Sequence, residues 1–179
     1  MFTLIFEPMK MELKKLPAKV NHIHFEEKPI ALELKQEGAS FDAPVIADLT
    51  VFISGDKLVC QGKVKTKVNL QCSRCLTVFS YPLETKLDFI LELRDGQIKV
   101  SSAEEETEFS FPSWDEVEID NLVREIILLA LPLKPLCSED CKGLCPVCGT
   151  DLNSSTCNCQ KEKVDPRWEK LKDLLNKKS

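Results

Sequence analysis

The sequence predicts an α+β fold: an antiparallel β-sheet covered by a helix, followed by a small cysteine-rich C-terminal segment and a terminal helix. Three observations predict it. Apolar and polar residues alternate through much of residues 30–91, which is the period of half-buried strands. Residues 120–131 have helical periodicity instead, and six of the nine cysteines lie between residues 137 and 159. We therefore expect an N-terminal arm or mis-annotated start at 1–10, the sheet and its helix at 11–132, and the cysteine-rich tail with the terminal helix at 133–179.

The expected strands follow one another between residues 30 and 91. Residues 30–35 alternate, and residues 45–53 place five apolar side chains on one face. A turn at 54–57 joins that strand to residues 58–70, which predicts an antiparallel hairpin, and Cys60 shares the apolar face of its second strand. Residues 77–83 and 87–91 add further strands, so we expect three to five in total. The boundary at residue 11 is suggested by Met9 and Met11, which both offer alternative starts.

Two helices are expected. Asp120 is a suitable N-cap for the first, whose apolar face continues until Pro132 stops the helix. Asp165 and Pro166 are suited to begin the second. Its apolar stripe, which we expect to pack on the rest of the protein, consists of Trp168, Leu171, Leu174 and Leu175.

Composition is that of an ordinary globular protein. The 179 residues are 43% hydrophobic and 30% charged, and the net charge of −5 gives no general attraction to nucleic acid. Basic residues gather only locally, in residues 57–74 and 161–178. The N-terminus lacks the pattern of a signal peptide, and no apolar run is long enough to span a bilayer. We therefore expect a cytoplasmic protein with reduced thiols and no membrane partner.

The cysteine-rich segment has the spacing of a zinc site. The motif Cys145-Pro146-Val147-Cys148-Gly149 is a zinc knuckle, and Cys157 with Cys159 completes a set of four thiolates. Cys137 and Cys141 could replace that last pair, or a sulfur-bridged zinc pair could use all six. A fully thiolate-ligated Zn²⁺ has no open position for water, so the site is expected to be structural. Disulfides are the alternative, and they require an oxidising compartment.

A further pair, Cys72 and Cys75, has the spacing of a redox dithiol. Thioredoxin-like chemistry requires a parallel strand before the pair and a helix after it, whereas both flanks here have the pattern of strands. We expect half of a second zinc site, completed by Cys137 and Cys141 if the fold brings them together. The alternative is a tight turn with two partly buried thiols.

Candidate nucleic-acid contacts lie on one predicted strand. Strand geometry sends Lys63, Lys65 and Lys67 to the same face, and Arg74 follows. Such a row suits a phosphate backbone, although three lysines also fit an ordinary solvated sheet face. The terminal helix is the second choice, with Arg167, Lys170 and Lys172.

Catalytic motifs are weak. His22 and His24 lie far in sequence from the cysteines, and the chain has neither a phosphate-binding glycine loop nor a nucleophile elbow. We therefore predict no catalytic residues, no small-molecule substrate and no enzymatic activity.

Several motifs together resemble the YceD family, over nearly the whole chain from about Met11. They are the strand that leads into Cys72-Ser73-Arg74-Cys75-Leu76, the helix ending at Leu131-Pro132, the run from Cys141 to Asn153 with Cys157-Asn158-Cys159, and Asp165-Pro166-Arg167-Trp168. The resemblance implies a bacterial or plastid protein required for accumulation of large-subunit ribosomal RNA. It also implies that Cys72 and Cys75 are the more general feature, since some members lack the C-terminal cysteines, and this counts against a requirement that both clusters share ions.

The expected function is therefore that of a non-enzymatic factor that binds large-subunit rRNA or a pre-ribosomal particle. One alternative is an adaptor whose acidic segment, near residues 104–120, binds a basic ribosomal protein. A thiol-based enzyme is the other.

Overall fold

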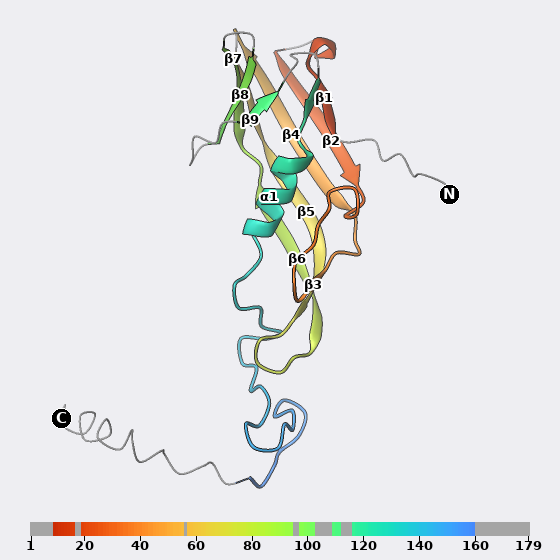
Figure 1. Ribbon diagram of the computed structural model, residues 1–179, viewed down its shortest axis with the longest axis vertical. Coiled ribbons are helices and arrows are strands. Elements are labelled where there is room, and N and C mark those ends of the chain that lie inside the picture. Colours follow the sequence, from red (N-terminus) through yellow and green to blue (C-terminus); the bar gives the residue numbers. More distant parts are fainter. Residues whose placement is uncertain are drawn as a thin grey trace, which may run out of the picture.

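The computed structural model describes residues 9–16, 19–55, 57–94, 97–102, 109–111 and 116–159. Its main element is an eight-stranded antiparallel sheet, accompanied by a two-stranded sheet and one α-helix, with the cysteine-rich segment at the lower end (Figure 1). The order of the main sheet is β2-β4-β5-β7-β8-β9, and β3 and β6 also pair with β5. Its strands are β2 (Val20–Glu27), β3 (Ala39–Ser40), β4 (Val45–Ser54), β5 (Lys57–Gln71), β6 (Val78–Lys86), β7 (Phe89–Arg94), β8 (Gln97–Ser102) and β9 (Phe109–Phe111).

The small sheet joins the N-terminal residues to the helix. β1 (Lys10–Glu12) pairs with β10 (Glu116–Glu118), and a 3₁₀ turn, η1 (Leu13–Lys15), follows β1. Met9, which lies in the predicted arm at 1–10, is buried and binds the start of α1 (Asp120–Leu129) through its backbone. Its N–H donates to Asp120 Oδ1 at 2.8 Å. Asp120 is therefore not the N-cap that the sequence predicted; Ile119 takes that position, and the carboxylate holds the N-terminal segment instead.

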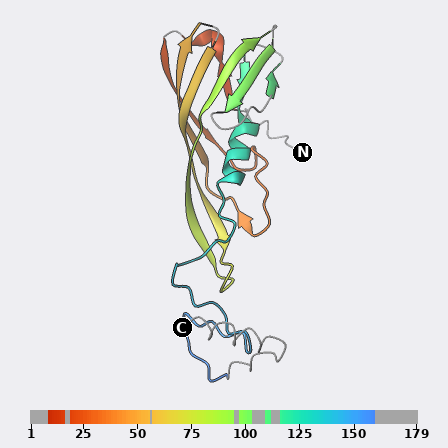
Figure 2. The same cartoon turned by 90° about the vertical axis from the view of Figure 1, so that its left-hand side faces the viewer.

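One face of the main sheet carries the core. The residues of β4 and β5 alternate between buried and accessible, as expected for strands with a single covered face. The helix α1 lies against the covered face and buries Val123 and Ile127 (Figure 2). Cys60 lies in this core as predicted, and burial raises the pKa of its thiol to about 12.

The strand that pairs with β5 on one side changes near the middle of β5. Lys57–Cys60 pairs with β7, whereas Lys63–Gln71 pairs with β6. Gly62 lies between the two registers: its carbonyl accepts from Leu87 N–H at 3.0 Å, and its N–H donates to Asp88 Oδ1 at 3.2 Å. A single strand thereby connects the upper sheet to the lower end.

Replacing Gly62 with alanine should destabilise the protein by about 3 kcal/mol, the upper part of the usual range for overpacking. A Cβ at this position would lie 2.0 Å from the Asp48 carbonyl oxygen, which belongs to the backbone and cannot rotate away. Gly55→Ala is the matched control: its φ of +63° is unfavourable for alanine, but no atom lies within 4 Å of the new methyl group. Urea unfolding should show a clearly larger loss for Gly62→Ala, and equal losses would contradict this explanation.

The fold is richer in β-structure than the predicted α+β arrangement. The hairpin of β4 and β5 is confirmed, as are β6 and β7, but the main sheet has eight strands instead of three to five. Residues 30–35 form turns, so the strand predicted there is wrong, whereas β2 at Val20–Glu27 was not predicted. The terminal helix predicted at 165–175 lies outside the described residues. In the described part of the chain, no helix has the length and apolar character needed to cross a membrane.

Candidate metal centres

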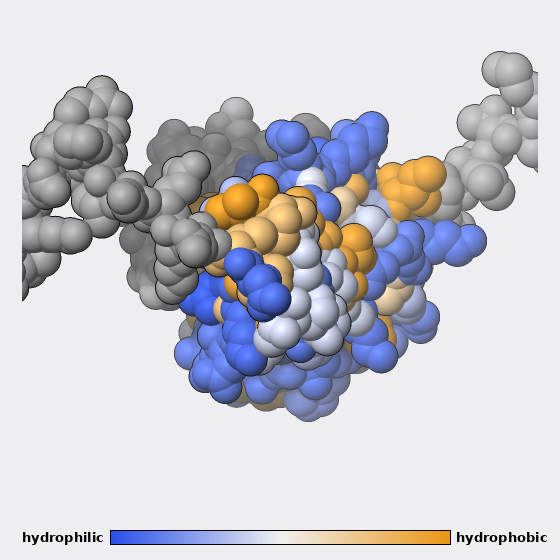
Figure 3. Space-filling model, turned by 90° about the horizontal axis from the view of Figure 1, so that it is seen from below, coloured by the Kyte–Doolittle hydropathy of each residue, from blue (hydrophilic) through white to orange (hydrophobic). Residues whose placement is uncertain are grey.

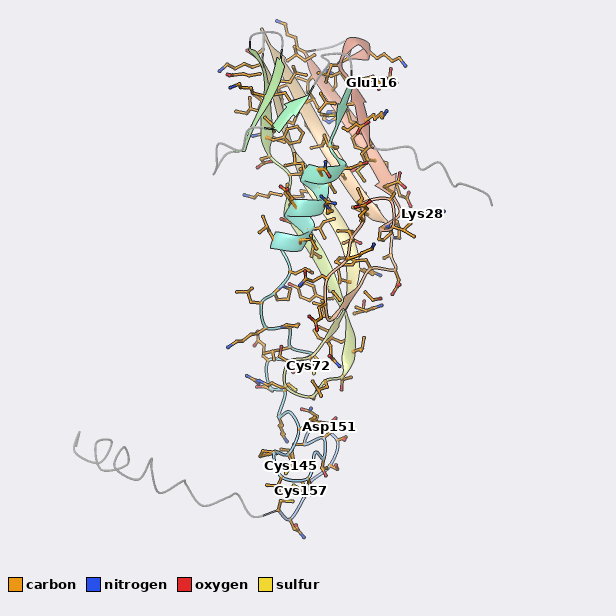
Figure 4. All side chains as sticks on the ribbon, in the orientation of Figure 1. Lys28, Cys72, Glu116, Cys145, Asp151 and Cys157 are labelled. Carbon is orange, nitrogen blue, oxygen red and sulfur yellow. The ribbon has the colours of Figure 1, made fainter. Side chains whose placement is uncertain are left out.

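Eight of the nine cysteines form two clusters at the lower end of the molecule (Figure 4). We call Cys72, Cys75, Cys137 and Cys141 the sheet cluster. The tail cluster consists of Cys145, Cys148, Cys157 and Cys159. Within each cluster, all four Sγ atoms lie within 4.8 Å of one another.

The sheet cluster joins the sheet to the segment that follows the helix. Cys72 directly follows β5 and Cys75 precedes β6, whereas Cys137 and Cys141 come from the chain beyond α1. Ser73 N–H also donates to the Pro135 carbonyl at 2.8 Å. The cluster therefore closes a connection between residues that are more than 60 positions apart, such as Cys75 and Cys137.

The first two cysteines of each cluster lie in the same type of turn. In the sheet cluster, Leu76 N–H donates to the Cys72 carbonyl at 2.9 Å, and Cys72 N–H donates to the Thr77 carbonyl at 2.9 Å. The tail cluster repeats both bonds four and five residues after Cys145. Gly149 N–H donates to the Cys145 carbonyl at 2.9 Å, and Cys145 N–H donates to the Thr150 carbonyl at 2.8 Å. Two cysteine knuckles with equivalent backbone hydrogen bonds thus lie in one chain.

The distances between sulfur atoms fit the tetrahedral coordination of one metal ion. A tetrahedron with metal–sulfur bonds of about 2.3 Å has edges of about 3.8 Å. Cys72 Sγ and Cys141 Sγ are 3.8 Å apart, and Cys75 Sγ and Cys137 Sγ are 3.6 Å apart. These separations are far longer than the bond of about 2.05 Å in a disulfide. Each cluster could therefore hold one metal ion.

Hydrogen bonds favour the thiolate form of Cys72 in the sheet cluster and of Cys145 and Cys148 in the tail cluster, where a backbone N–H of Cys148 lowers the pKa of Cys145. A backbone N–H of Cys137 lowers the pKa of Cys72 to about 6, and hydrogen bonding with Thr150 lowers the pKa of Cys148 to about 6. Neighbouring thiols keep their protons, because hydrogen bonding to Cys75 raises the pKa of Cys137 to about 12. Hydrogen bonding to Cys148 does the same for Cys159. An ion that binds either cluster must displace protons.

The two clusters are linked by polar contacts around Arg74. Its guanidinium donates from Nη1 to the carbonyl oxygens of Glu139 at 3.1 Å and Cys141 at 2.8 Å, and its own carbonyl accepts from Leu144 N–H at 3.2 Å. Asn153 Nδ2 lies 3.5 Å from Cys141 Sγ, so a residue of the tail loop contacts the sheet cluster. Arg74, predicted to bind nucleic acid, is therefore placed where it supports the cysteine segment.

The predicted lysines project from the open face of the sheet. Lys63, Lys65 and Lys67 are exposed on β5, and Lys86 lies opposite Lys63 on β6. Glu84, which sequence reasoning missed, accepts from Lys63 Nζ at 2.7 Å and lies 3.7 Å from Lys65 Nζ. A hydrogen bond with Glu84 raises the pKa of Lys63, and the same bond lowers the pKa of Glu84.

The histidines lie on the same face but away from the cysteines. His24 Nδ1 is 2.6 Å from Asp48 Oδ1, and His22 Nδ1 is 3.1 Å from Thr50 Oγ1. Arg167, Lys170 and Lys172, the second choice for nucleic-acid contact, lie outside the described residues.

The fold and its clusters define an antiparallel β-sheet protein with an appended tetracysteine segment. The chain belongs to the YceD family: residues 60–175 match the family described as large ribosomal RNA subunit accumulation protein YceD. No solved structure matches the chain.

Relatives are found in bacteria and in plants. An uncharacterized protein of Mycobacterium tuberculosis is 27% identical, covering 98% of this chain and 85% of that protein. The uncharacterized protein YlbN of Bacillus subtilis is 30% identical over 92% of this chain and 82% of its own length. A Zea mays protein is 29% identical over 73% of this chain and 54% of its own, and is named large ribosomal RNA subunit accumulation protein YCED homolog 1, chloroplastic.

Proposed function

We propose that this protein is a non-enzymatic cytoplasmic factor that supports accumulation of large-subunit ribosomal RNA by binding that RNA or a precursor particle. Membership of the YceD family is the observation that carries the proposal. In this proposal the open face of the sheet contacts the RNA backbone, and the two cysteine clusters hold Zn²⁺.

The open face supports the first part of this proposal. Lys63, Lys65, Lys67 and Lys86 lie on adjacent strands, so their ammonium groups are spread over a surface instead of a line. Repeated cations suit a phosphate backbone because each contact releases bound counterions. Glu84 neutralises part of this surface and would have to give up its lysine contacts when phosphates bind.

Zinc is the metal that best fits both clusters. Four thiolates at tetrahedral spacing select Zn²⁺ or iron in iron–sulfur chemistry, and paired knuckles of this form are typical of structural zinc sites. A bound ion would fix four sulfur atoms and leave no coordination position for a substrate. Cys137 and Cys141 would attach the tail to the sheet, and Cys157 and Cys159 would close the tail loop.

The proposal is tested by crosslinking the protein to RNA in living cells with ultraviolet light and sequencing the attached RNA. We expect reads concentrated in a region of the large-subunit rRNA. The purified protein should bind a transcript of that region with an affinity whose logarithm falls linearly with the logarithm of the salt concentration.

Folded, expressed protein that gives almost no crosslinks would overturn direct RNA binding and favour the adaptor. The specific observation that favours the adaptor is that two of the predicted RNA-binding residues already have partners within the protein. Arg74 donates to backbone carbonyls, and Lys63 donates to Glu84. A ribosomal protein that co-purifies with the chain after RNase treatment would then identify the partner.

A further inference from the structure

A partly apolar hollow of about 390 Å³ lies beside the sheet cluster, between the end of α1 and the start of the knuckle. Its apolar lining includes Leu70, Leu76, Leu128, Leu131, Leu133 and Pro135. Figure 3, the view from this end of the molecule, shows apolar patches among hydrophilic side chains. Leu76 is 55% exposed and Leu133 is fully exposed, so the hollow presents large apolar groups to solvent in the described part of the chain.

The backbone conformation at Leu76 is unfavourable for leucine. Its φ of +61° is in the left-handed region, which disfavours a residue with a Cβ. The equivalent position of the other knuckle is Gly149, with a φ of +74°. The fold therefore accepts both backbone strain and the exposure of an apolar side chain at Leu76, where glycine would avoid both. This is expected if the side chain serves to make a contact.

We propose that the C-terminal segment 165–175 binds in this hollow through its apolar stripe, with Leu76 and Leu133 as the main contacts. The stripe comprises Trp168, Leu171, Leu174 and Leu175, whose spacing places them on one face of a helix. It matches the hollow in chemical character, since both are rich in large apolar side chains.

The segment follows soon after the tail cluster, whose loop contacts the knuckle beside the hollow. Cys159, where the described chain ends, belongs to the tail cluster, and Leu144 in the same loop bonds to the carbonyl of Arg74, two residues before Leu76. Residues 160–164, as an extended linker, span up to about 17 Å. Five residues therefore separate the tail cluster from the start of the segment.

Charge also favours this occupant. Residues 160–179 contain seven lysines and arginines against four acidic residues. The lining of the hollow includes Glu37 and no lysine or arginine. The basic polar face of the bound segment would thus lie near Glu37, and its apolar face would cover Leu76 and Leu133.

Trp168 provides the measurement in the full-length protein. In a Trp114→Phe background it is the single tryptophan, so its emission wavelength and its quenching by acrylamide report whether the segment is bound. We expect blue-shifted, protected emission. Leu76→Gly should weaken binding about tenfold, the effect of losing most of one buried leucine side chain, and shift Trp168 toward the exposed state.

The same substitution separates binding from folding. Because glycine accepts a φ of +61°, Leu76→Gly should leave the unfolding midpoint and the metal content unchanged or slightly improved. Leu129→Ser is the matched control: Leu129 is 85% exposed on α1 and does not line the hollow, so Trp168 should stay protected. Leu133→Ser, a second variant in the lining, should reproduce the effect of Leu76→Gly.

Two results would overturn the proposal. One is a Trp168 that is as accessible to acrylamide in the parent as in Leu76→Gly. The other is protection that disappears on dilution, which would assign the hollow to a second copy of the chain. Neither result bears on RNA binding, so this proposal and the proposed function fail independently.

Discussion

Replacing Cys75 with serine is expected to lower the free energy of unfolding by about 2–5 kcal/mol, the range for loss of a covalent cross-link such as a disulfide in a small domain. Cys75 is 6% exposed and lies in the cluster that connects the sheet to Cys137, 62 residues away. Clips that close long loops remove the most entropy from the unfolded chain. The same change at Cys148, in the locally closed tail cluster, should leave the unfolding of the sheet nearly unchanged.

Metal content and unfolding must be measured together. Native mass spectrometry should find two zinc ions in the parent protein and one in each of the variants Cys75→Ser and Cys148→Ser. Urea unfolding followed by circular dichroism should then show a large loss of stability for Cys75→Ser alone. Equal losses in the two variants would contradict the division into a connecting cluster and a local one.

Cys60 supplies the control for this experiment. It is the one cysteine outside both clusters and is fully buried in the core. Cys60→Ala should cost some stability, because it leaves a small cavity, while both zinc ions remain. A variant that lost metal on this change would show that metal content follows general stability and does not identify ligands.

Strand predictions succeeded where alternation was uninterrupted. Val45, Ala47, Leu49 and Val51 point to the covered face as predicted, because a period of two admits one register on a sheet with a single buried face. In residues 30–35 the same pattern was misleading: Leu32 and Leu34 are buried, but neither lies in a strand. Burial of alternate residues therefore does not by itself require a strand.

The missed elements had weaker signals. In β2, Ile23 and Phe25 alternate with His22 and His24, but two apolar residues are too few to distinguish a strand from an extended loop. The N-terminal contact of Asp120 was not predictable from the sequence, since its partner Met9 is 111 positions away. Local pattern identifies the helix, whereas its position depends on contacts that the pattern does not contain.

The structure brings together the two sets of four cysteines that the sequence analysis named, Cys145, Cys148, Cys157 and Cys159, and Cys72 and Cys75 with Cys137 and Cys141. The sequence left other sets open as well. Spacing identifies each knuckle but not the pair that completes it, because several sets of four were chemically equivalent. A further sequence signal for two knuckles is the motif Cys-x-x-Cys-x-Thr, which occurs twice, at Cys72 and at Cys145. The repeated backbone hydrogen bonds show that the two motifs fold alike. A repeat of this kind predicts two knuckles, and each knuckle then requires its own second pair.

Reversing the charge of Lys63, Lys65 and Lys67 together is expected to weaken binding to a large-subunit rRNA transcript at least about tenfold at moderate salt. The salt dependence should also become shallower by up to about 2, since each lost phosphate contact on a single strand contributes about 0.7 to the slope. All three side chains are exposed, and surface changes usually alter stability little, so the fold should persist.

Glu84 provides a test in the opposite direction. Its carboxylate occupies Lys63 and Lys65, so Glu84→Gln should free both ammonium groups and strengthen RNA binding by about 2–5-fold, the size expected from an exposed ion pair. Lys15→Glu, in η1 and outside the main sheet, is the control for net charge and should have little effect. Filter binding over a salt series measures the RNA affinity of the triple lysine variant, of Glu84→Gln and of Lys15→Glu.

The pair of opposite effects distinguishes a contact surface from general electrostatics. If the open face binds the RNA backbone, Glu84→Gln and the triple lysine reversal must change affinity in opposite directions, while Lys15→Glu leaves it near the parent value. If net charge alone determined the affinity, Lys15→Glu would weaken RNA binding as much as the charge reversal of one of the three lysines on β5. Unchanged affinity in the triple variant would exclude this face, and the RNA would then have to bind elsewhere or through a partner.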